Sequence, residues 1–257
     1  MRLMQITHDL AIGGLQQVVV SICRTINRDL FDVSVLCLRE LGDLTGEVEK
    51  LGIKVIHLPR KKNGVDYLSF LKAAEILRRE KTEIIHTHNT QPFIDGTMGA
   101  LMSGVKTIVH TDHGRIFPDK KRYMLAERLM SHFAYRVVGV SEHTSQALIK
   151  YEKISPGKVV TITNGIDMSR YDIAADTAKK RRELGISKDG PVIGLGARLV
   201  EQKGLSYLIR ALPAIIREFP DITLVIAGEG ACEEALKREA GVAGVDKNVI
   251  FAGPRLD

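Results

Sequence analysis

The spacing of Arg198 and Lys203 is the strongest chemical signal in the sequence. The apolar run at residues 191–195 has the length of a buried strand, and a strongly patterned helix begins after Gly204. A turn between a strand and a helix N-terminus presents backbone N–H groups and the positive end of the helix dipole to an anion. The Arg fork and the Lys point charge both suit phosphate oxygens. The segment therefore predicts a site for a diphosphate.

Two glycine loops follow the first strands of the two halves of the chain. Gly13-Gly14 could admit a ligand close to the backbone, and a tight strand–helix turn explains the pair equally well. Residues 194–199 begin like a dinucleotide fingerprint, but Leu199 takes the third small position. This departure argues against NAD.

A third loop, Gly228-Glu229-Gly230, follows the apolar run at residues 222–227. Because carboxyl ends of parallel strands share one edge of a sheet, we expect this loop on the same rim as Arg198 and Lys203. Alone it is a weak signal for ligand binding.

Four histidines stand at the ends of predicted strands: His86, His88, His110 and His113. Three interpretations remain open at this point. One of the rings acts as a base or hydrogen-bonding group in a cleft, the rings serve only as caps and packing, or they form a zinc site. Zinc is the least favoured, because a further ligand is not obvious and nearby basic residues disfavour a cation.

The net charge of +6 is concentrated around residues 106–136, where seven Lys and Arg outnumber three acids. Residues 119–130 are basic at Lys120, Lys121 and Arg122 and amphipathic afterwards. Such a helix suits an anionic membrane surface, and a domain-packing helix with a solvated basic end is the alternative. Nucleic acid is not expected as a partner, because aromatic content is 5% and Trp is absent.

Short apolar runs alternate with helical stripes along the chain, which is typical of α/β units with parallel sheets covered on both faces. We predict ten strands, at residues 2–7, 32–38, 53–58, 83–86, 107–111, 136–140, 159–163, 191–195, 222–227 and 248–252. Asn164-Gly165 breaks the pattern. The predicted organisation is a first domain at residues 1–167, a linker at 168–189 and a second domain at 190–257. A helical stripe over 205–219 contains Pro213, where we expect a kink or a restart.

The composition fits a soluble protein of the cytoplasm. Hydrophobic residues make up 44% of the 257 residues and charged residues 26%. We expect no signal peptide and no membrane-spanning helix. Cys23, Cys37 and Cys232 form no close pairs in the sequence, so we expect small buried thiols rather than a bridge or a metal site.

The order and spacing of these motifs resemble the retaining nucleotide-sugar glycosyltransferases of the GT-B fold, in the large family 4. The matching segments are Gly13-Gly14, His86-Thr87-His88, His113-Gly114, Val140-Ser141-Glu142, Asn164-Gly165-Ile166-Asp167, Gly196-Ala197-Arg198, Lys203-Gly204, Gly228-Glu229-Gly230 and Val249-Ile250-Phe251-Ala252-Gly253. The resemblance implies two Rossmann-like domains. The first would bind a glycan or lipid-linked acceptor and the second a nucleotide sugar of the UDP or GDP type.

The resemblance also assigns roles to residues. Arg198 and Lys203 would hold the donor diphosphate and stabilise the charge that develops on it as the glycosidic bond breaks. His113 matches the histidine beside the acceptor or the transferred sugar, with His110 as the alternative. Gly13 and Gly14 would lie near the donor. Neither a metal nor another cofactor is expected, because the basic pair takes the place of a divalent ion.

The second domain departs from the family pattern, since only three of its strands are present where about six are common. We therefore expect an incomplete domain and weak or no activity of this chain by itself. The predicted function is transfer of a sugar with retention, in synthesis of a cell-surface polysaccharide or glycolipid, in the cytoplasm or on the inner face of the membrane. The alternatives are a nucleotide-sugar epimerase of the same fold and a non-catalytic fragment that binds a membrane surface or a partner.

Overall fold

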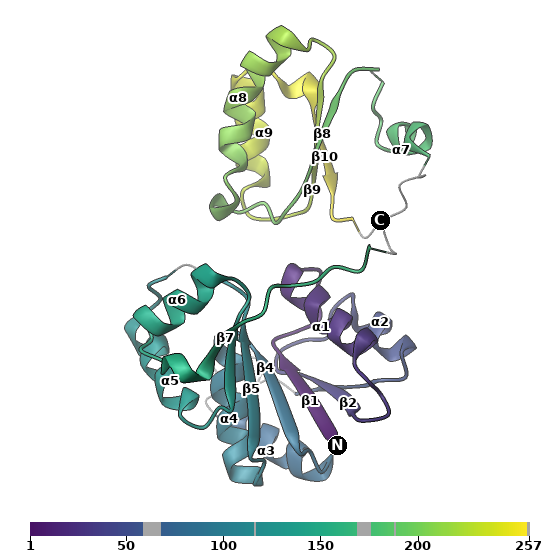
Figure 1. The fold of residues 1–257 in the computed structure, drawn as a ribbon. Coiled ribbons are helices and arrows are strands. Elements are labelled where there is room, and N and C mark those ends of the chain that lie inside the picture. Colours follow the sequence, from purple (N-terminus) through teal and green to yellow (C-terminus); the bar gives the residue numbers. More distant parts are fainter. Residues whose placement is uncertain (59–67, 116, 169–175, 188, 256–257) are drawn as a thin grey trace. The chain divides into compact units, whose positions relative to one another are not determined.

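The computed structural model describes residues 1–58, 68–115, 117–168, 176–187 and 189–255. The chain divides into two compact units, Met1–Arg170 and Tyr171–Asp257 (Figure 1). Each unit is an α/β structure built on its own parallel sheet, as the sequence predicts.

Unit 1 contains a seven-stranded parallel sheet with the strand order β3-β2-β1-β4-β5-β6-β7. Its strands are β1 (Arg2–Thr7), β2 (Asp32–Cys37), β3 (Lys54–His57), β4 (Ile84–His88), β5 (Thr107–Asp112), β6 (Arg136–Gly139) and β7 (Val159–Thr161). Its helices are α1 (Gly14–Thr25), α2 (Thr45–Lys50), α3 (Ser69–Arg79), α4 (Thr90–Ser103), α5 (Lys121–Ser131) and α6 (Glu142–Lys150), and a short 3-10 helix, Pro156–Lys158, precedes β7. Among the described residues, no helix of either unit is both long and apolar enough to cross a membrane.

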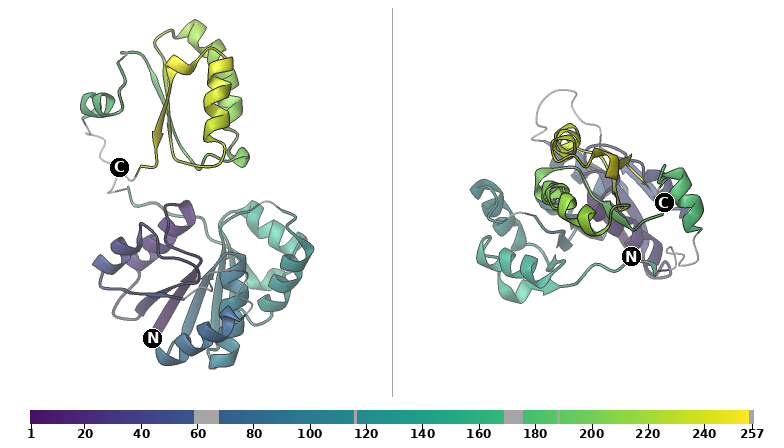
Figure 2. Two further views of the ribbon diagram at one scale, coloured as in Figure 1. Left: turned by 180° about the vertical axis from the view of Figure 1, so that it is seen from behind. Right: turned by 90° about the horizontal axis from the view of Figure 1, so that it is seen from above.

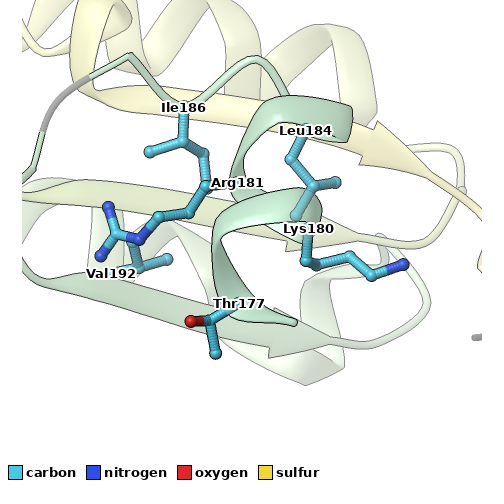
Figure 3. Close-up of a pocket in the computed structure, with 6 residues that line it drawn as sticks. All are labelled: Thr177, Lys180, Arg181, Leu184, Ile186 and Val192. Carbon is cyan, nitrogen blue, oxygen red and sulfur yellow. The ribbon is translucent and has the colours of Figure 1, made fainter. Parts of the chain in front are cut away.

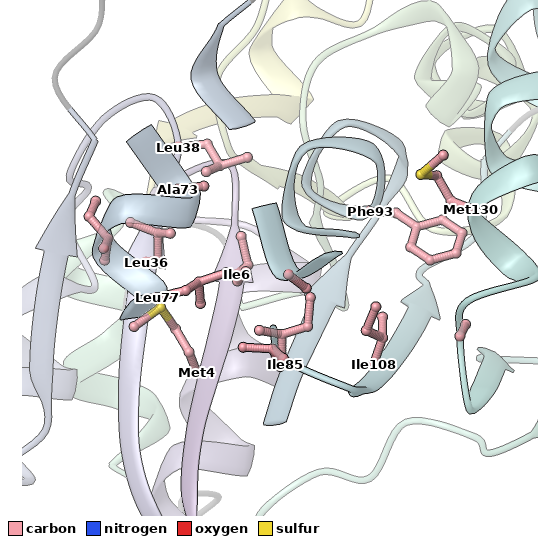
Figure 4. Close-up of a cluster of buried hydrophobic side chains, with 14 of the residues drawn as sticks. Met4, Ile6, Leu36, Leu38, Ala73, Leu77, Ile85, Phe93, Ile108 and Met130 are labelled. Atoms are coloured by element: carbon pink, nitrogen blue, oxygen red, sulfur yellow. The ribbon is translucent and has the colours of Figure 1, made fainter. Parts of the chain in front are cut away.

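Alternation along the strands divides the core of unit 1 between the two faces of the sheet. On one face, Met4 and Ile85 pack with Phe93 of α4 and Leu77 of α3 (Figure 4). On the other face, Val35 packs with buried residues of α1 and α2. Because side chains two positions apart share a face, residues at the strand ends are also assigned to one face or the other.

Unit 2 has a three-stranded parallel sheet with the order β10-β9-β8. It consists of α7 (Thr177–Glu183), β8 (Val192–Gly196), α8 (Leu205–Glu218), β9 (Thr223–Ala227), α9 (Glu233–Val242) and β10 (Val249–Gly253), with short 3-10 helices at Glu201–Lys203 and Asp246–Asn248. Helices α8 and α9 cover one face of this sheet, and α7 lies on the other side (Figure 2). This second unit is shorter than the first.

Helices α7 and α8 of unit 2 differ from what the sequence predicts. The predicted linker at residues 168–189 includes α7, and Asp176 caps this helix by accepting a hydrogen bond from the Lys179 amide. Of the kink or restart predicted at Pro213, the restart is wrong, because α8 continues through this residue to Glu218. Packing of Leu205, Ile209 and Leu212 into the core outweighs the hydrogen bond that a proline removes.

The three cysteines carry free thiols. Cys23 and Cys37 are buried in the core beneath α1 and α2, and burial raises their pKa values to about 11 and about 12. Cys232 is partly buried. At neutral pH the two core thiols are protonated and behave as small apolar residues.

Candidate functional site

His86, His88 and His113 gather on one face of the unit 1 sheet, at the carboxyl ends of its central strands. His86 and His88 lie two positions apart in β4, so their rings share a face, and their centroids are 4.3 Å apart. His113 directly follows β5, and its ring centroid lies 5.2 Å from that of His88. The structure thus brings together three of the four predicted histidines.

A chain of hydrogen bonds fixes the orientation of these rings. His88 Nε2 lies 2.7 Å from Gln5 Oε1, so His88 donates from Nε2 and leaves Nδ1 as an acceptor. His113 Nε2 lies 2.9 Å from that Nδ1 and is therefore the donor. His113 Nδ1 consequently carries a lone pair, and it has no hydrogen-bond partner among the described residues.

The three rings are neutral at physiological pH. Burial lowers the pKa of His113 to about 4, and burial together with the electrostatic interaction with the neighbouring His113 ring lowers that of His86 to about 4. Burial also holds the pKa of His88 well below its ordinary value. A neutral imidazole can accept a proton or a hydrogen bond, whereas it cannot act as a strong acid.

His110 lies on the opposite face of the sheet from His86, His88 and His113. Its ring stacks on Phe93 of α4, with centroids 3.9 Å apart, and its Nδ1 is 3.0 Å from Thr87 Oγ1. Burial keeps its pKa well below the ordinary value. The structure therefore separates His110 from the other three rings and places it in the core.

The Gly13-Gly14 loop forms the start of α1. Asp9 Oδ1 accepts hydrogen bonds from the Ala11 amide at 3.1 Å and from Gln16 Nε2 at 2.7 Å, which orders the loop. A Cβ at Gly14 would meet nothing within 4 Å, and a Cβ at Gly13 would meet only the flexible end of Gln16. Packing therefore does not require glycine at position 14, and the space in front of α1 is open.

Arg198 and Lys203 are exposed on the rim of the unit 2 sheet. Arg198 lies in the loop after β8, and Lys203 ends the 3-10 helix that precedes α8. Neither side chain forms an ion pair or hydrogen bond with any residue that the structure describes. The two cations are thus available to an anionic ligand. The fully buried Leu199, next to Arg198, anchors this loop in the core of unit 2.

The Gly228-Glu229-Gly230 loop packs directly against this segment. The Leu199 amide donates to the Glu229 carbonyl at 2.9 Å, while Glu229 itself is exposed. A Cβ at Gly228 would lie 2.0 Å from the Ala197 carbonyl oxygen, and one at Gly230 would lie 2.4 Å from that of Leu199. Close backbone contact therefore accounts for both glycines.

A separate pocket of unit 2 lies away from the loops that carry Arg198 and Gly228. A hollow of about 390 Å³ opens between α7 and β8 (Figure 3). Its lining consists of Thr177, Lys180, Arg181, Leu184, Ile186 and Val192. None of the predicted donor residues contributes to it.

The predicted membrane-facing residues lie at the start of α5. Lys121 and Arg122 begin the helix, Lys120 precedes it, and all three are exposed. The Arg122 guanidinium lies over the ring of Tyr123. The same helix exposes Leu125 and further apolar residues.

One buried trio, His110, Asp112 and Glu127, has side chains of the metal-binding types. However, Arg115 forms ion pairs with both carboxylates, at 3.1 Å to Asp112 and 2.5 Å to Glu127. Because a guanidinium already neutralises these oxygens, the trio does not fit a cation site.

The sequence interpretation missed residues that support the histidines. Gln5 is fully buried and orients His88, and the Asn89 side chain accepts a hydrogen bond from the His113 amide at 3.0 Å. Asn89 has a φ of 64°, which few residue types adopt. A polar residue inside the apolar β1 run was the available signal for Gln5. The ion pairs of Arg115 with Asp112 and Glu127 could not be predicted from the spacing of these residues in the sequence.

Comparisons with known proteins agree with this architecture. Residues 12–170 match the family model of Glycosyltransferase Family 4, and residues 176–256 match that of glycosyl transferases group 1. The structure of Anabaena HepE in complex with UDP-glucose superposes with a TM-score of 0.86 at 20% identity, covering 99% of this chain and 69% of that one. This likeness shows that the fold is GT-B.

Two curated relatives align over most of the chain. UDP-Gal:alpha-D-GlcNAc-diphosphoundecaprenol alpha-1,3-galactosyltransferase of Escherichia coli is 27% identical over 88% of this chain and 61% of its own length. A GDP-mannose-dependent monoacylated phosphatidylinositol monomannoside mannosyltransferase of Corynebacterium glutamicum is 26% identical over 94% of this chain and 64% of its own length. The chain thus spans less than two thirds of the length of these relatives. It belongs to Glycosyltransferase Family 4.

Proposed function

We propose that the protein transfers a sugar from a nucleotide-sugar donor to a glycan or lipid-linked acceptor, with retention of anomeric configuration. The donor diphosphate binds at Arg198 and Lys203 in unit 2, and the acceptor side of the reaction is served by His113 in unit 1. Gly13, Gly14 and Glu229 approach the donor. No metal or other cofactor takes part.

The unpaired cations at the unit 2 rim carry this proposal. Arg198 and Lys203 are exposed, lie five positions apart and have no counter-charge among the described residues. As the glycosidic bond breaks, negative charge develops on the diphosphate, so fixed cations stabilise the transition state more than the ground state. Two cations five positions apart therefore supply the positive charge that a divalent metal would otherwise provide.

The names of the relatives support the substrate classes. The E. coli relative is named for a UDP-sugar and an acceptor linked to diphosphoundecaprenol, and the C. glutamicum relative for GDP-mannose and a phosphatidylinositol mannoside. Both acceptors are lipid-linked. We infer a UDP- or GDP-type donor and an acceptor of this kind, used in synthesis of a cell-surface polysaccharide or glycolipid in the cytoplasm.

The unpartnered Nδ1 of His113 indicates what the unit 1 site contributes. Because the ring is neutral and its Nε2–H is engaged by His88, only Nδ1 can accept a hydrogen bond from a sugar hydroxyl. This contact would orient a hydroxyl without introducing charge.

Calorimetry with UDP, GDP and ADP tests the donor site. Lys203→Ala and Arg198→Ala should weaken binding of the preferred nucleotide, whereas Lys247→Ala and Arg217→Ala should not. Lys247 precedes β10 and Arg217 lies in the last turn of α8, so both controls remove an exposed cation away from the rim. Equal affinity of Lys203→Ala and wild type would refute the assignment. Binding that survives EDTA is expected, and binding that requires a divalent ion would contradict the metal-free scheme.

An epimerase of the same fold is the second candidate. It would use the same phosphate contacts and act on the nucleotide sugar without an acceptor. Release of free nucleoside diphosphate only after an acceptor is added would exclude it, and conversion of the donor sugar with no acceptor present would favour it over transfer.

A membrane contact through α5 is part of the proposal. Leu125 and Leu129 are 67% and 56% exposed, and Arg122 and Arg128 flank them on the same helix. Apolar side chains between basic ones suit an anionic lipid surface. This contact would place unit 1 on the inner face of the cytoplasmic membrane, close to a lipid-linked acceptor.

Sedimentation with vesicles of anionic and of neutral lipid tests this contact. Wild type should sediment with anionic vesicles only. Lys120→Ala/Lys121→Ala/Arg122→Ala should weaken the association, and Leu125→Ser/Leu129→Ser should do the same. Leu101→Ser/Met102→Ser is the matched control, because these residues are exposed on α4. If wild type does not bind anionic vesicles, the membrane contact is refuted while the donor site is unaffected.

A further inference from the structure

Arg115, three residues beyond β5, lies among four carboxyl groups. Its Nε is 3.1 Å from Asp112 Oδ2, its Nη1 is 3.1 Å from Asp119 Oδ2, and its Nη2 is 2.5 Å from Glu127 Oε2. Nη2 also pairs with Glu152. The carboxyl groups come from the end of β5, the following loop, α5 and the segment after α6. One guanidinium therefore joins four parts of unit 1.

The group is buried, and its formal charges do not balance. The side chains of Asp112 and Glu152 have no exposed surface, that of Glu127 is 1% exposed and that of Arg115 is 16% exposed. Several negative charges cannot be buried around one positive charge without a large desolvation cost. Uptake of a proton by one carboxylate is the usual way in which such an excess is relieved.

Glu152 is the group that takes up the proton. Burial, followed by the charge of Glu127, raises the pKa of Glu152 to about 9. Burial also raises the pKa of Glu127, although the Arg115 charge and a hydrogen bond with Glu152 oppose the shift. The ionisable groups that face this pair are Asp112, Arg115 and His110, whose ring nitrogen lies within 4.8 Å of a Glu127 carboxyl oxygen. At neutral pH, Glu152 is thus protonated and shares its proton with the Glu127 carboxylate.

Residues of this network precede and follow His113 in the sequence, so the network fixes the chain on both sides of His113. Asp112 Oδ1 accepts a hydrogen bond from the Gly114 amide at 2.9 Å. Arg115 Nη1 also donates to Thr90 Oγ1 in the first turn of α4. Asn89, the residue before Thr90, holds the His113 amide. Release of the guanidinium would therefore free the loop that carries His113.

We propose that Arg115 is a positioning residue for His113, held in place by the buried carboxyl groups of Glu127 and Glu152, which both contact its Nη2. The proposal rests on the proposed role of His113 in sugar transfer for its functional meaning. The quantity that it predicts is the position of the His113 imidazole ring, which is measured in the absence of donor and acceptor. Failure of the network and failure of the transferase assignment are therefore distinguishable.

Nitrogen NMR of ¹⁵N-histidine-labelled protein, recorded across a pH titration, tests the positioning role. In wild type the pKa of His113 is about 4. In Arg115→Met the ring should lose its enclosed position, and its pKa should rise toward the ordinary value of about 6.5. Arg24→Met is the matched control, because Arg24 lies on another part of unit 1 and, among the described residues, forms an ion pair only with Glu47. An unchanged His113 titration in folded Arg115→Met protein would overturn the proposal.

Two isosteric variants keep the proposal testable if Arg115→Met does not fold. Glu152→Gln keeps a neutral, hydrogen-bonding group, so His113 should titrate as in wild type. Glu127→Gln removes the negative charge that lies 2.5 Å from Arg115 Nη2 and leaves only Asp112 and Asp119 at 3.1 Å, so the guanidinium is held less firmly and the pKa of His113 should rise. Identical His113 titrations in these two variants would overturn the shared-proton arrangement. Carboxyl ¹³C NMR should also show one group that titrates near pH 9 in wild type and is missing in Glu152→Gln, and its absence from wild type would overturn the same point.

Discussion

The polar side chains at the carboxyl ends of the two sheets differ in whether they have partners within the protein. In unit 1, His88 binds Gln5 and His113, and Arg115 is surrounded by carboxyl groups, so that these side chains are held in place by partners within the protein. In unit 2, Arg198 and Lys203 are exposed and have no partner among the described residues. The first rim is organised before any ligand arrives, whereas the second rim lacks the negative charge that a ligand would bring.

This difference separates two kinds of mutational effect. A buried group with several partners contributes to the stability of the fold, and its loss leaves other charges unpaired. An exposed cation without a partner contributes little to stability, so its loss changes binding and catalysis only. Variants that change stability but not catalysis, or catalysis but not stability, therefore test this difference between the two rims.

The largest effect is expected for Arg115→Met. Breaking a buried ion pair typically costs about 3–5 kcal/mol, because the remaining charge is left without a partner. Arg24→Met removes a half-exposed pair with Glu47 and should cost only about 0–1 kcal/mol. Urea unfolding of the two variants beside wild type measures the difference. Similar losses in both would show that the Arg115 network is an ordinary surface cluster.

Arg198→Ala and Lys203→Ala should show the opposite behaviour. Loss of one fixed donor that acts on developing charge costs on the order of 10²–10³ in rate. Unfolding free energies should stay within about 0.5 kcal/mol of wild type, because both side chains are exposed and neither forms an ion pair or hydrogen bond with a described residue. Initial rates with a nucleotide-sugar donor, together with urea unfolding, check both statements. A loss of stability without a loss of rate would place the two residues in the fold rather than in the donor site.

Glu152→Gln should change how stability depends on pH. The folded-state pKa of Glu152 is about 9, against an ordinary value of 4.5, so the folded protein retains a proton that the unfolded chain releases. This contribution is fully present below pH 4.5 and is lost as pH rises toward 9. The slope is at most about 1.4 kcal/mol per pH unit. Glu152→Gln removes this slope, so its stability relative to wild type should increase from pH 5 to pH 9. Parallel curves for the two proteins would show that Glu152 is ionised in the fold.

The strands could be read from the sequence because each is a short apolar run bounded by turns. All ten predicted strands overlap observed ones, and the parallel order follows from the alternation with helices. α7 was not predicted, since a polar helix of seven residues has no apolar stripe. The helical stripe around Pro213 was predicted, but its continuity was not, because local propensity argues against a proline inside a helix and only packing of the whole stripe decides it.

The histidines show what sequence reasoning can and cannot place. Their position at strand ends followed from the strand pattern, but the face that each ring occupies depends on the exact register. His110 lies within β5 and points to the core beside Phe93, whereas His113 follows β5 and lies beside His88. Arg115 joins Glu127 and Glu152, which are 12 and 37 positions away. Such contacts depend on how α5 and α6 pack, and no local spacing records them.

The smallest effect is expected at a glycine of the unit 1 rim. A Cβ at Gly14 or at Gly46 would meet nothing within 4 Å, and both residues lie in the first turn of a helix. Gly14→Ala and Gly46→Ala should therefore each raise stability by about 0.5 kcal/mol, because alanine restricts the unfolded chain. If glycine at position 14 serves to admit the donor, only Gly14→Ala should weaken nucleotide-sugar binding. Calorimetry on the two variants measures this, and equal affinities would show that the open space before α1 is a feature of the turn alone.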